Sequence, residues 1–366
     1  MENNELIKYE GGLVRRVSDA ISVTNKLLDV AEPQLIPYRK KDKWGFCTPN
    51  KKIIIPCNYE DAHSFKDGLA GARKNKKWGL LNEYGNEIIL FKYDAIHSFR
   101  EGLAVVKKND KYGYIDQVGE EIILCKYDSA NYFKEGLASV IANKKYGYID
   151  KAGKEIVPLK YDFTHDFSEG LGIVESKKKF GFINKMGEEI IPCTYLFTLS
   201  FKEGLAGVIT EKMRYNGFID YVGNLVIHLK NGHGNRFSEG FGNIELDNKW
   251  GFIDKSGKEV ISCKYEDAGN FSNGLAKVKM KGKIGYIDKT GEIIIPYKYE
   301  DAWDFNKSFA SVCFKNKWGV IDKNEIQIIP FKYDKYINFS EGLARVQKDG
   351  LECGYINKQG VEYWED

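Results

Sequence analysis

Residues 111–144 read KYGYIDQVGEEIILCKYDSANYFKEGLASVIANK, and close copies of this stretch fill most of the 366-residue chain. The clearest marker is a glycine, which stands at positions 45, 79, 113, 147, 181, 217, 251, 285, 319 and 354. The intervals between these ten glycines are 34 residues, apart from one of 36 and one of 35. Such a period indicates one small supersecondary unit repeated in tandem, whose apolar faces are buried only against neighbouring units.

An aromatic residue precedes the glycine in seven of the ten units. These seven, which we interpret as structural, are Trp44, Trp78, Tyr112, Tyr146, Phe180, Trp250 and Trp318. Asn216, Ile284 and Cys353 take the place of the aromatic in the other three units. Glycine weakens a strand unless something approaches it closely. We therefore expect the glycine to leave a gap that a side chain of the neighbouring unit fills.

These aromatic-glycine pairs, together with a second marker, Glu-Gly-Leu-Ala, at residues 101–104 and 135–138, resemble the WG-repeat (KWG-type) family of bacterial β-rich repeat proteins. The resemblance spans about residues 35–366. It implies an extended β-rich array with a role in interactions, and it brings no established chemistry with it.

Within a unit, the apolar and polar alternation predicts three short strands, at residues 103–106, 112–116 and 121–124 in the copy quoted above. Asn109-Asp110 supplies residues that tolerate positive φ between the first two strands. Gly153, in Asp150-Lys-Ala-Gly, stands where a residue with positive φ ends the second turn. Each unit is therefore expected to be an antiparallel meander, and the fold class is all-β.

The arrangement of the units is less directly encoded. Both terminal units hold all three predicted strands, so neither end offers an unpaired strand to close a ring, and ten blades would exceed the four to eight usual in propellers. We expect ten three-stranded units over residues 34–366 in an open, twisted, solenoid-like array, with a closed multi-bladed β-propeller as the alternative. Residues 1–33 form an N-terminal extension, with a short capping helix predicted from Ser18 to Ala31.

Composition limits the partners and the compartment. The net charge is only +3, from 55 Lys and Arg against 52 Asp and Glu, which disfavours nucleic acid and membrane partners. No secretion signal is visible, so a cytoplasmic location is predicted. Four of the seven cysteines share one apolar repeat position, and no Cys-x-x-Cys pair occurs. We interpret them as small hydrophobic residues, and we expect no metal and no cofactor.

One repeat position varies in chemistry from unit to unit. It lies four residues beyond the repeated tyrosine (Tyr59 in the first copy), and its polar and aromatic occupants are the candidate binding residues His63, His97, Asn131, His165 and Trp303. Equivalent positions align along one surface of a stacked array. A loop position that tolerates any residue is the other interpretation. His233, in the irregular segment at 231–236, is a further candidate.

The sequence offers no catalytic constellation, because the recurring carboxylates such as Glu101 and Asp116 suit turns that cap local N–H groups. We expect a non-catalytic scaffold that presents an extended β surface to an unidentified protein partner. A carbohydrate-binding or cell-envelope glycan-binding module is the alternative, because exposed aromatic faces can stack on sugars.

Overall fold

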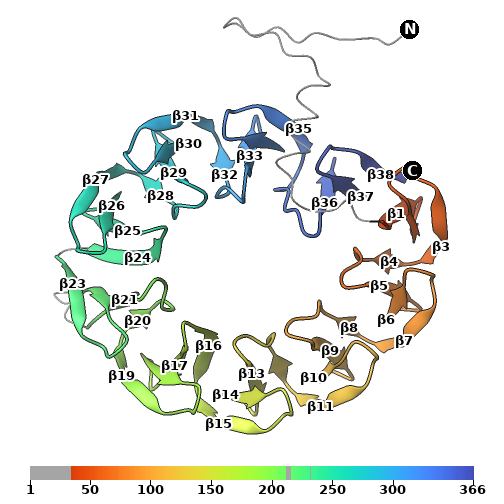
Figure 1. Cartoon of the computed structure of the whole chain (residues 1–366), viewed down its shortest axis with the longest axis horizontal. Coiled ribbons are helices and arrows are strands. Elements are labelled where there is room, and N and C mark those ends of the chain that lie inside the picture. Colours follow the sequence, from red (N-terminus) through yellow and green to blue (C-terminus); the bar gives the residue numbers. More distant parts are fainter. Residues whose placement is uncertain (1–33, 212–215, 231) are drawn as a thin grey trace, which may run out of the picture.

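The computed structural model describes residues 34–211, 216–230 and 232–366, which contain strands and turns and no helix. The helix expected at residues 18–31 lies outside these ranges. The strands form nine sheets arranged as blades around a common centre (Figure 1). The protein is therefore a closed β-propeller, and the prediction of an open solenoid is wrong.

Blades 1 to 8 each contain four antiparallel strands in chain order from the centre outward (Figure 1). Blades 1 to 4 consist of β4 (Asp61–Ala62), β5 (Leu69–Lys74), β6 (Lys77–Asn82) and β7 (Glu87–Tyr93); β8 (Ala95–Ile96), β9 (Ala104–Lys108), β10 (Lys111–Ile115) and β11 (Glu121–Tyr127); β12 (Ser129–Ala130), β13 (Leu137–Ala142), β14 (Lys145–Asp150) and β15 (Glu155–Tyr161); β16 (Phe163–Ser168), β17 (Leu171–Ser176), β18 (Lys179–Asn184) and β19 (Glu189–Tyr195).

Blades 5 to 8 consist of β20 (Phe197–Thr198), β21 (Ala206–Ile209), β22 (Asn216–Ile219) and β23 (Leu225–Leu229); β24 (Gly232–Ser238), β25 (Phe241–Leu246), β26 (Lys249–Asp254) and β27 (Glu259–Tyr265); β28 (Asp267–Ala268), β29 (Leu275–Met280), β30 (Lys283–Asp288) and β31 (Ile293–Tyr299); β32 (Asp301–Ala302), β33 (Phe309–Phe314), β34 (Lys317–Asp322) and β35 (Gln327–Tyr333). The ninth, closing blade joins β36 (Leu343–Lys348), β37 (Leu351–Asn357) and β38 (Glu362–Glu365) to β1 (Ile36–Lys40), β2 (Lys43–Cys47) and β3 (Ile53–Tyr59).

Each of blades 1 to 8 thus has one strand more than the sequence predicted. The extra, innermost strand is only two residues long in most blades, as in β4 and β12. Two residues are too few to show a period in the sequence. The segment that carries this strand, for which we predicted no strand, faces the centre of the ring.

The ring closes through a parallel pairing of β1 with β38, in which Arg39 lies opposite Trp364 and Lys40 opposite Glu365. The Arg39 guanidinium also donates to the carbonyl oxygen of Cys353 and pairs with Asp366. The first unit starts at β1 and has no inner strand of its own, so the first and last units combine in one six-stranded sheet. We did not predict the inner strand from the sequence. We therefore could not see that the first unit lacks a strand that the other units have.

The hydrophobic core lies between the blades. Nine clusters of buried side chains follow one another around the ring, and each is shared by two neighbouring blades. Between blades 2 and 3, for example, Phe133 packs against Tyr114 with ring centroids 4.8 Å apart. A blade alone would expose both apolar faces, so burial between blades confirms the expectation that the units depend on one another.

The structural reason for a glycine at this repeat position differs from the one that we predicted. A Cβ atom built on Gly147 would lie 2.5 Å from the carbonyl oxygen of Val157 and 2.9 Å from the amide nitrogen of Leu159. Both atoms belong to β15 of the same blade, where the register between β14 and β15 shifts. The glycine therefore accommodates the backbone of its own outer strand, and not a neighbouring unit's side chain.

The two faces of the ring are built from different turns. The turn between the second and third strands, with Asn143 and Lys144 at positive φ in blade 3, defines what we call the hairpin face. The turn between the first and second strands, with Glu135 and Gly136 at positive φ, defines the Glu-Gly face. The predicted positive φ values at Asn109 and Gly153 are confirmed.

Candidate functional site

The variable repeat position lies at the inner edge of the blades, at or just beyond the innermost strands (Figure 1). Its occupants, in blade order, are His63, His97, Asn131, His165, Leu199, Asn235, Gly269, Trp303 and Ile337, and we call them the rim column. His63, His97, Asn131, His165 and Trp303 are exposed although they belong to the innermost part of each blade. Side chains that sequence separates by 34 or more residues therefore stand on one circle around the centre of the ring.

The backbone of the rim column is fixed from both sides. The amide of His63 donates to the carbonyl oxygen of Gly71 in the same blade at 2.8 Å, and Trp303 donates to Ser311 at 2.9 Å. From the preceding blade, the buried hydroxyl of Tyr148 donates to the carbonyl oxygen of His165 at 2.6 Å. These bonds fix the backbone of the rim column whichever side chain the position carries, so the binding column and the tolerant loop position both stay as predictions.

Aromatic contacts orient several rim residues. The His63 ring stacks on Trp78 with centroids 4.5 Å apart. Trp303, 50% exposed, packs in a tilted arrangement against Tyr336 of the closing blade, 44% exposed, with centroids 4.5 Å apart. Large apolar groups exposed at a fixed place are typical of binding surfaces. Trp303 and Tyr336 are therefore the most prominent contact group of the rim.

The remaining candidates are arranged differently. His165 Nδ1 is 3.5 Å from the hydroxyl of Ser200 in the next blade. His233 does not belong to the rim column, because Asn235 occupies that position in blade 6. Instead, its Nε2 lies 3.3 Å from Glu245, and its ring meets the edge of Trp250. The structure thus brings the candidates into one ring and does not gather them into one pocket.

The rings of two rim histidines are partly enclosed by neighbouring side chains, although part of each ring is exposed, and this enclosure affects their titration. Burial lowers the pKa of His63; Asp61 opposes this shift, while Arg345 and His97 add to it. Burial likewise lowers the pKa of His97. Loss of water around an imidazole disfavours its charged form. Both residues therefore favour the neutral state, which can donate and accept hydrogen bonds.

The seven aromatics interpreted as structural pack near the hairpin face. Trp44 is buried, 4% exposed, and the other six are half-buried. Several contact the next blade, as Tyr146 does with Phe163 and Phe180 with Phe197, at centroid distances of 5.7 and 6.3 Å. Through these contacts they are part of the interface between blades.

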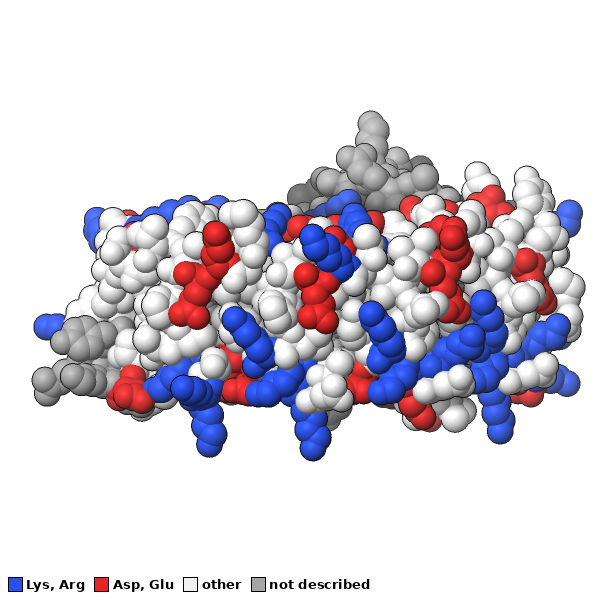
Figure 2. Space-filling model, turned by 90° about the horizontal axis from the view of Figure 1, so that it is seen from below, with Lys and Arg blue, Asp and Glu red and all other residues white. Residues whose placement is uncertain are grey.

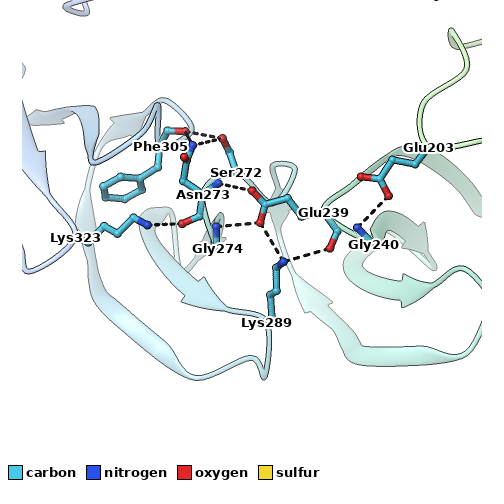
Figure 3. Close-up of polar contacts among 9 residues, drawn as sticks. All are labelled: Glu203, Glu239, Gly240, Ser272, Asn273, Gly274, Lys289, Phe305 and Lys323. Carbon is cyan, nitrogen blue, oxygen red and sulfur yellow. Dashed lines mark hydrogen bonds and ion pairs between the residues drawn. The ribbon is translucent and has the colours of Figure 1, made fainter. Parts of the chain in front are cut away.

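The Glu-Gly face carries an interaction that sequence reasoning missed (Figure 3). Glu239 accepts hydrogen bonds from the backbone amides of Asn273 and Gly274 in the next blade, the latter at 3.0 Å. Lys289 of that next blade pairs with the same carboxylate at 3.1 Å. We call this arrangement a clasp. It differs from the local capping that we expected for these glutamates, whereas Asp116 does cap its own turn at Val118 and Glu120.

Clasps recur at Glu101, Glu135, Glu169 and Glu203, each toward the following blade. The series changes where Asn273 replaces the glutamate. There the amide of Asn273 donates to the carbonyl oxygen of Phe305 at 3.1 Å, and Ser272 donates to the same oxygen at 2.6 Å (Figure 3). A recurrence of Glu-Gly every 34 residues was visible in the sequence, but nothing local indicated that the acceptor and donor belong to different units.

Lysine and arginine side chains gather along one edge of the ring seen from the side (Figure 2). The lysine that precedes the aromatic-glycine pair is ion-paired in several blades, as in Lys111 with Asp128 at 2.5 Å and Lys145 with Asp162 at 2.6 Å. Near the start of the array, Arg73 pairs with Glu60 at 3.5 Å and Lys77 with Asp94. Several basic side chains of the first units are thus neutralised by neighbouring carboxylates.

The seven cysteines are free thiols, and burial raises the pKa of Cys193 and of Cys263 to about 11. Among residues 34–211, 216–230 and 232–366, no group of three His, Cys, Asp or Glu side chains is placed to hold a metal ion. The same part of the chain contains no helix that is long and apolar enough to cross a membrane.

The aromatic-glycine pairs, the clasps and the nine-bladed ring define a propeller built from one repeated unit. The family described as "WG containing repeat" matches residues 44–78, 78–112, 112–146, 146–180, 180–211, 250–283, 284–318 and 318–351. Because these matches cover well over half of the chain, the protein belongs to this family. The unmatched stretch between residues 211 and 250 contains Asn216, which replaces the repeat aromatic, and the irregular segment around His233.

No curated protein sequence matches the chain. Among solved structures, a eukaryotic initiation factor is similar at 11% identity, covers 90% of this chain and 95% of its own, and has a TM-score of 0.48. Dihydro-heme d1 dehydrogenase NirN in complex with DHE is similar at 10% identity over 91% of this chain and 77% of its own, with a TM-score of 0.42. Hsv2 of Kluyvelomyces marxianus is 9% identical over 75% of this chain and 96% of its own, with a TM-score of 0.38. Likenesses of this size say nothing about function.

Proposed function

We propose that the chain is a non-catalytic, cytoplasmic scaffold that holds a protein partner against the rim column and the exposed aromatics beside it. A propeller of repeated blades is a frame suited to binding. The observation that carries the proposal is the rim column itself. The framework residues repeat from blade to blade, whereas this position changes from His to Asn, Leu, Gly, Trp and Ile.

A repeated frame that presents unlike side chains on one circle favours recognition of a surface with many contact points. Catalysis would need convergent polar groups with tuned titration around one reacting atom. Five glutamates of the Glu-Gly face are engaged in clasps, and several carboxylates of the hairpin face are paired with lysines. This use of the charged residues supports binding in preference to chemistry.

The test is affinity capture of the partner from the native organism, followed by a binding titration with the purified partner. Trp303→Ala and Tyr336→Ala should each weaken binding about tenfold or more, because exposed aromatic anchors carry much of the binding energy of interfaces. Tyr84→Ala is the matched control, because Tyr84 is 85% exposed and lies in the turn between β6 and β7, away from the rim. An equal loss with Tyr84→Ala, or no loss at the rim, contradicts the proposal.

A glycan-binding role is the second candidate, and the half-exposed Trp303 favours it, because a sugar ring can stack on an indole. Titration with neutral oligosaccharides distinguishes the two. Saturable binding of an oligosaccharide that is lost in Trp303→Ala, with no protein partner retained, would replace the scaffold with a glycan-binding module.

A further inference from the structure

A cavity of about 330 Å³ lies between blades 2 and 3 at the hairpin face. Its apolar walls are Tyr127 at the end of β11 together with Ala142 and Leu159 of blade 3, and the three side chains belong to one shared hydrophobic cluster. Its polar lining consists of four exposed residues, Lys126, Asn143, Lys145 and Glu155. The cavity thus combines an apolar wall with a few polar groups, as small-molecule sites do.

The same place between blades 7 and 8 is filled by the chain itself. The counterparts of the three apolar residues, five repeat units later and at the same positions in their strands, are Tyr299, Phe314 and Phe331. The rings of Phe314 and Tyr299 meet edge to face with centroids 6.2 Å apart, and Phe331 lies 5.7 Å from Phe314. Because Ala142 stands where the other junction has Phe314, the cavity lacks one phenyl ring.

The junction of blades 7 and 8 also supplies a carboxylate. The hydroxyl of Tyr299 donates to Glu325 at 3.0 Å, and Lys298 pairs with the same carboxylate at 2.5 Å. The counterpart of Glu325 between blades 2 and 3 is Gly153, which has no side chain. The cavity therefore lacks both groups that surround the repeated tyrosine at the other junction, an aromatic ring and a carboxylate.

Two donors beside the cavity are left without an acceptor. Within residues 34–211, 216–230 and 232–366, the hydroxyl of Tyr127 forms no hydrogen bond and Lys126 forms no ion pair. The Lys126 ammonium lies 5.2 Å from the centroid of the Tyr127 ring, so both donors are at the same end of the apolar wall. An ammonium and a hydroxyl in this arrangement suit a carboxylate, and the wall suits an aromatic ring.

Glu155 is the one group of the lining that opposes an anion. It is exposed and contacts neither donor in the structure. Its counterpart between blades 1 and 2, Glu121, accepts from the repeated tyrosine at 2.9 Å, whereas its counterpart between blades 7 and 8 is the neutral Gln327. Glu155 therefore competes with a ligand carboxylate for the same donors, and this competition can be measured.

We propose that the cavity between blades 2 and 3 binds a small carboxylic acid that carries an aromatic ring. The ring of the acid packs against Tyr127, as Phe314 packs against its own tyrosine. The carboxylate accepts from Lys126 and from the hydroxyl of Tyr127, in the place that Glu325 has at the other junction. The cavity lies on the hairpin face and contains no residue of the rim column, so this inference does not depend on the scaffold proposal.

The probe is 3-phenylpropionate, titrated into the full chain by isothermal titration calorimetry. We expect saturable binding at one site. 3-Phenylpropionamide, which keeps the ring and lacks the charge, should bind at least tenfold more weakly because the charge-assisted hydrogen bonds are lost. 3-Cyclohexylpropionate, which keeps the charge and lacks the aromatic ring, should bind severalfold more weakly. N-acetyl-glycyl-glycyl-phenylalanine ends in the same ring and carboxylate, and tighter binding of this peptide would assign the same chemistry to a peptide carboxyl terminus.

Four variants locate the binding site. Ala142→Phe places in the cavity the ring that Phe314 has between blades 7 and 8, so it should abolish binding. Ser176→Phe, at the same repeat position of blade 4, is the matched control and should leave the affinity unchanged. Lys126→Gln should weaken binding about tenfold by removing the charged donor. Glu155→Gln should strengthen binding severalfold, because it removes the competing carboxylate.

Thermal unfolding shows whether each variant is folded. If Ala142→Phe is not, the changes at the exposed residues Lys126 and Glu155 decide. Equal binding of the acid and the amide, full affinity in Ala142→Phe, weaker binding in Glu155→Gln, or no saturable binding of 3-phenylpropionate would overturn the inference. The scaffold proposal is tested separately, by partner capture and Trp303→Ala, and no result with these acids bears on it.

Discussion

At the scale of the residue, the glycine of the aromatic-glycine pair has the most restricted environment in the repeat. In blade 3 the carbonyl oxygen of Val157 leaves no room for a Cβ atom on Gly147. The aromatic neighbour, Tyr146, instead contacts the next blade. The two residues of the dipeptide thus have different roles. The glycine makes room for the outer strand of its own blade, and the aromatic residue contacts the next blade.

Gly147→Ala should therefore lower the free energy of unfolding by about 1–3 kcal/mol, because the β15 backbone must shift to admit a methyl group. Lys154→Ala, at an exposed turn of the same blade, is the control and should change stability by less than about 0.5 kcal/mol. Chemical denaturation of both variants measures the difference. Equal effects would show that β15 tolerates the methyl group.

The lowered pKa values of the rim histidines predict that the stability of the fold depends on pH. Because burial lowers the pKa of His63, the unfolded chain binds more protons than the folded one just below 6.5, the ordinary pKa of a histidine side chain. This contribution to stability is present above that value and is lost as the pH falls toward the lower pKa of the folded state. His63→Gln should therefore flatten the decrease in denaturation midpoint between pH 7 and pH 5.

His97→Gln should act in the same direction, because burial lowers the pKa of His97 as well. Asn131→Ala, at the same position of another blade, changes no titratable group and should leave the slope of the pH profile as it is. A slope that changes in Asn131→Ala and not in His63→Gln would contradict the argument.

At the scale of the element, neighbouring blades are linked by packing in the middle and by clasps on the Glu-Gly face. Burial raises the pKa of Glu239, but the hydrogen bonds from Lys289 and from the amides of Gly274 and Asn273 outweigh it, so the pKa is lowered below 4.5. A carboxylate with a lowered pKa stabilises the fold above its unfolded pKa.

Glu239→Gln should lower the free energy of unfolding at pH 7 by about 1 kcal/mol, because hydrogen bonds from an ammonium and two amides lose their charged acceptor. The difference from wild type should shrink as the pH falls through the folded-state pKa. Glu292→Gln is the control, because Glu292 is an exposed glutamate next to the turn that contains Lys289. A difference that is independent of pH would mean that the carboxylate charge contributes nothing.

At the scale of the whole molecule, we expect the closing blade to be the weakest part of the ring. Its two halves share two residue pairs between β1 and β38, whereas β13 and β14 within blade 3 share six. Arg345 strengthens this place by joining the last unit to Asp61 of blade 1. Local opening should therefore start between β1 and β38.

Arg345→Ala should lower the free energy of unfolding by roughly 2 kcal/mol, because it leaves the partly buried Asp61 carboxylate unpaired. Hydrogen exchange should accelerate in β1 and β38 and stay unchanged in β17 and β18 of blade 4. Arg100→Ala, which removes an exposed guanidinium that lies over Tyr132, is the control. Uniform acceleration around the ring would show that the closing blade opens no sooner than the others.

The local features of this protein follow from its sequence. The ten units, three of the four strands in each of blades 1 to 8, the positive φ at Asn109 and Gly153 and the all-β class depend on residues that are close in sequence. Strand alternation and turn preferences act over two to four residues, so single units reveal them. The rim column was also visible as a variable position, although its place at the centre of the ring was not.

Only the tertiary structure decided what joins units to one another. The inner strand forms because each short segment pairs with the edge of the sheet that follows it in the chain. Glu239 likewise accepts hydrogen bonds from backbone amides 34 and 35 residues away. Closure depends on the rotation between successive blades adding up to a full turn, a quantity that no single unit encodes. The open array was therefore a wrong prediction, and the partnership of the first and last units in one blade became visible only in the folded ring.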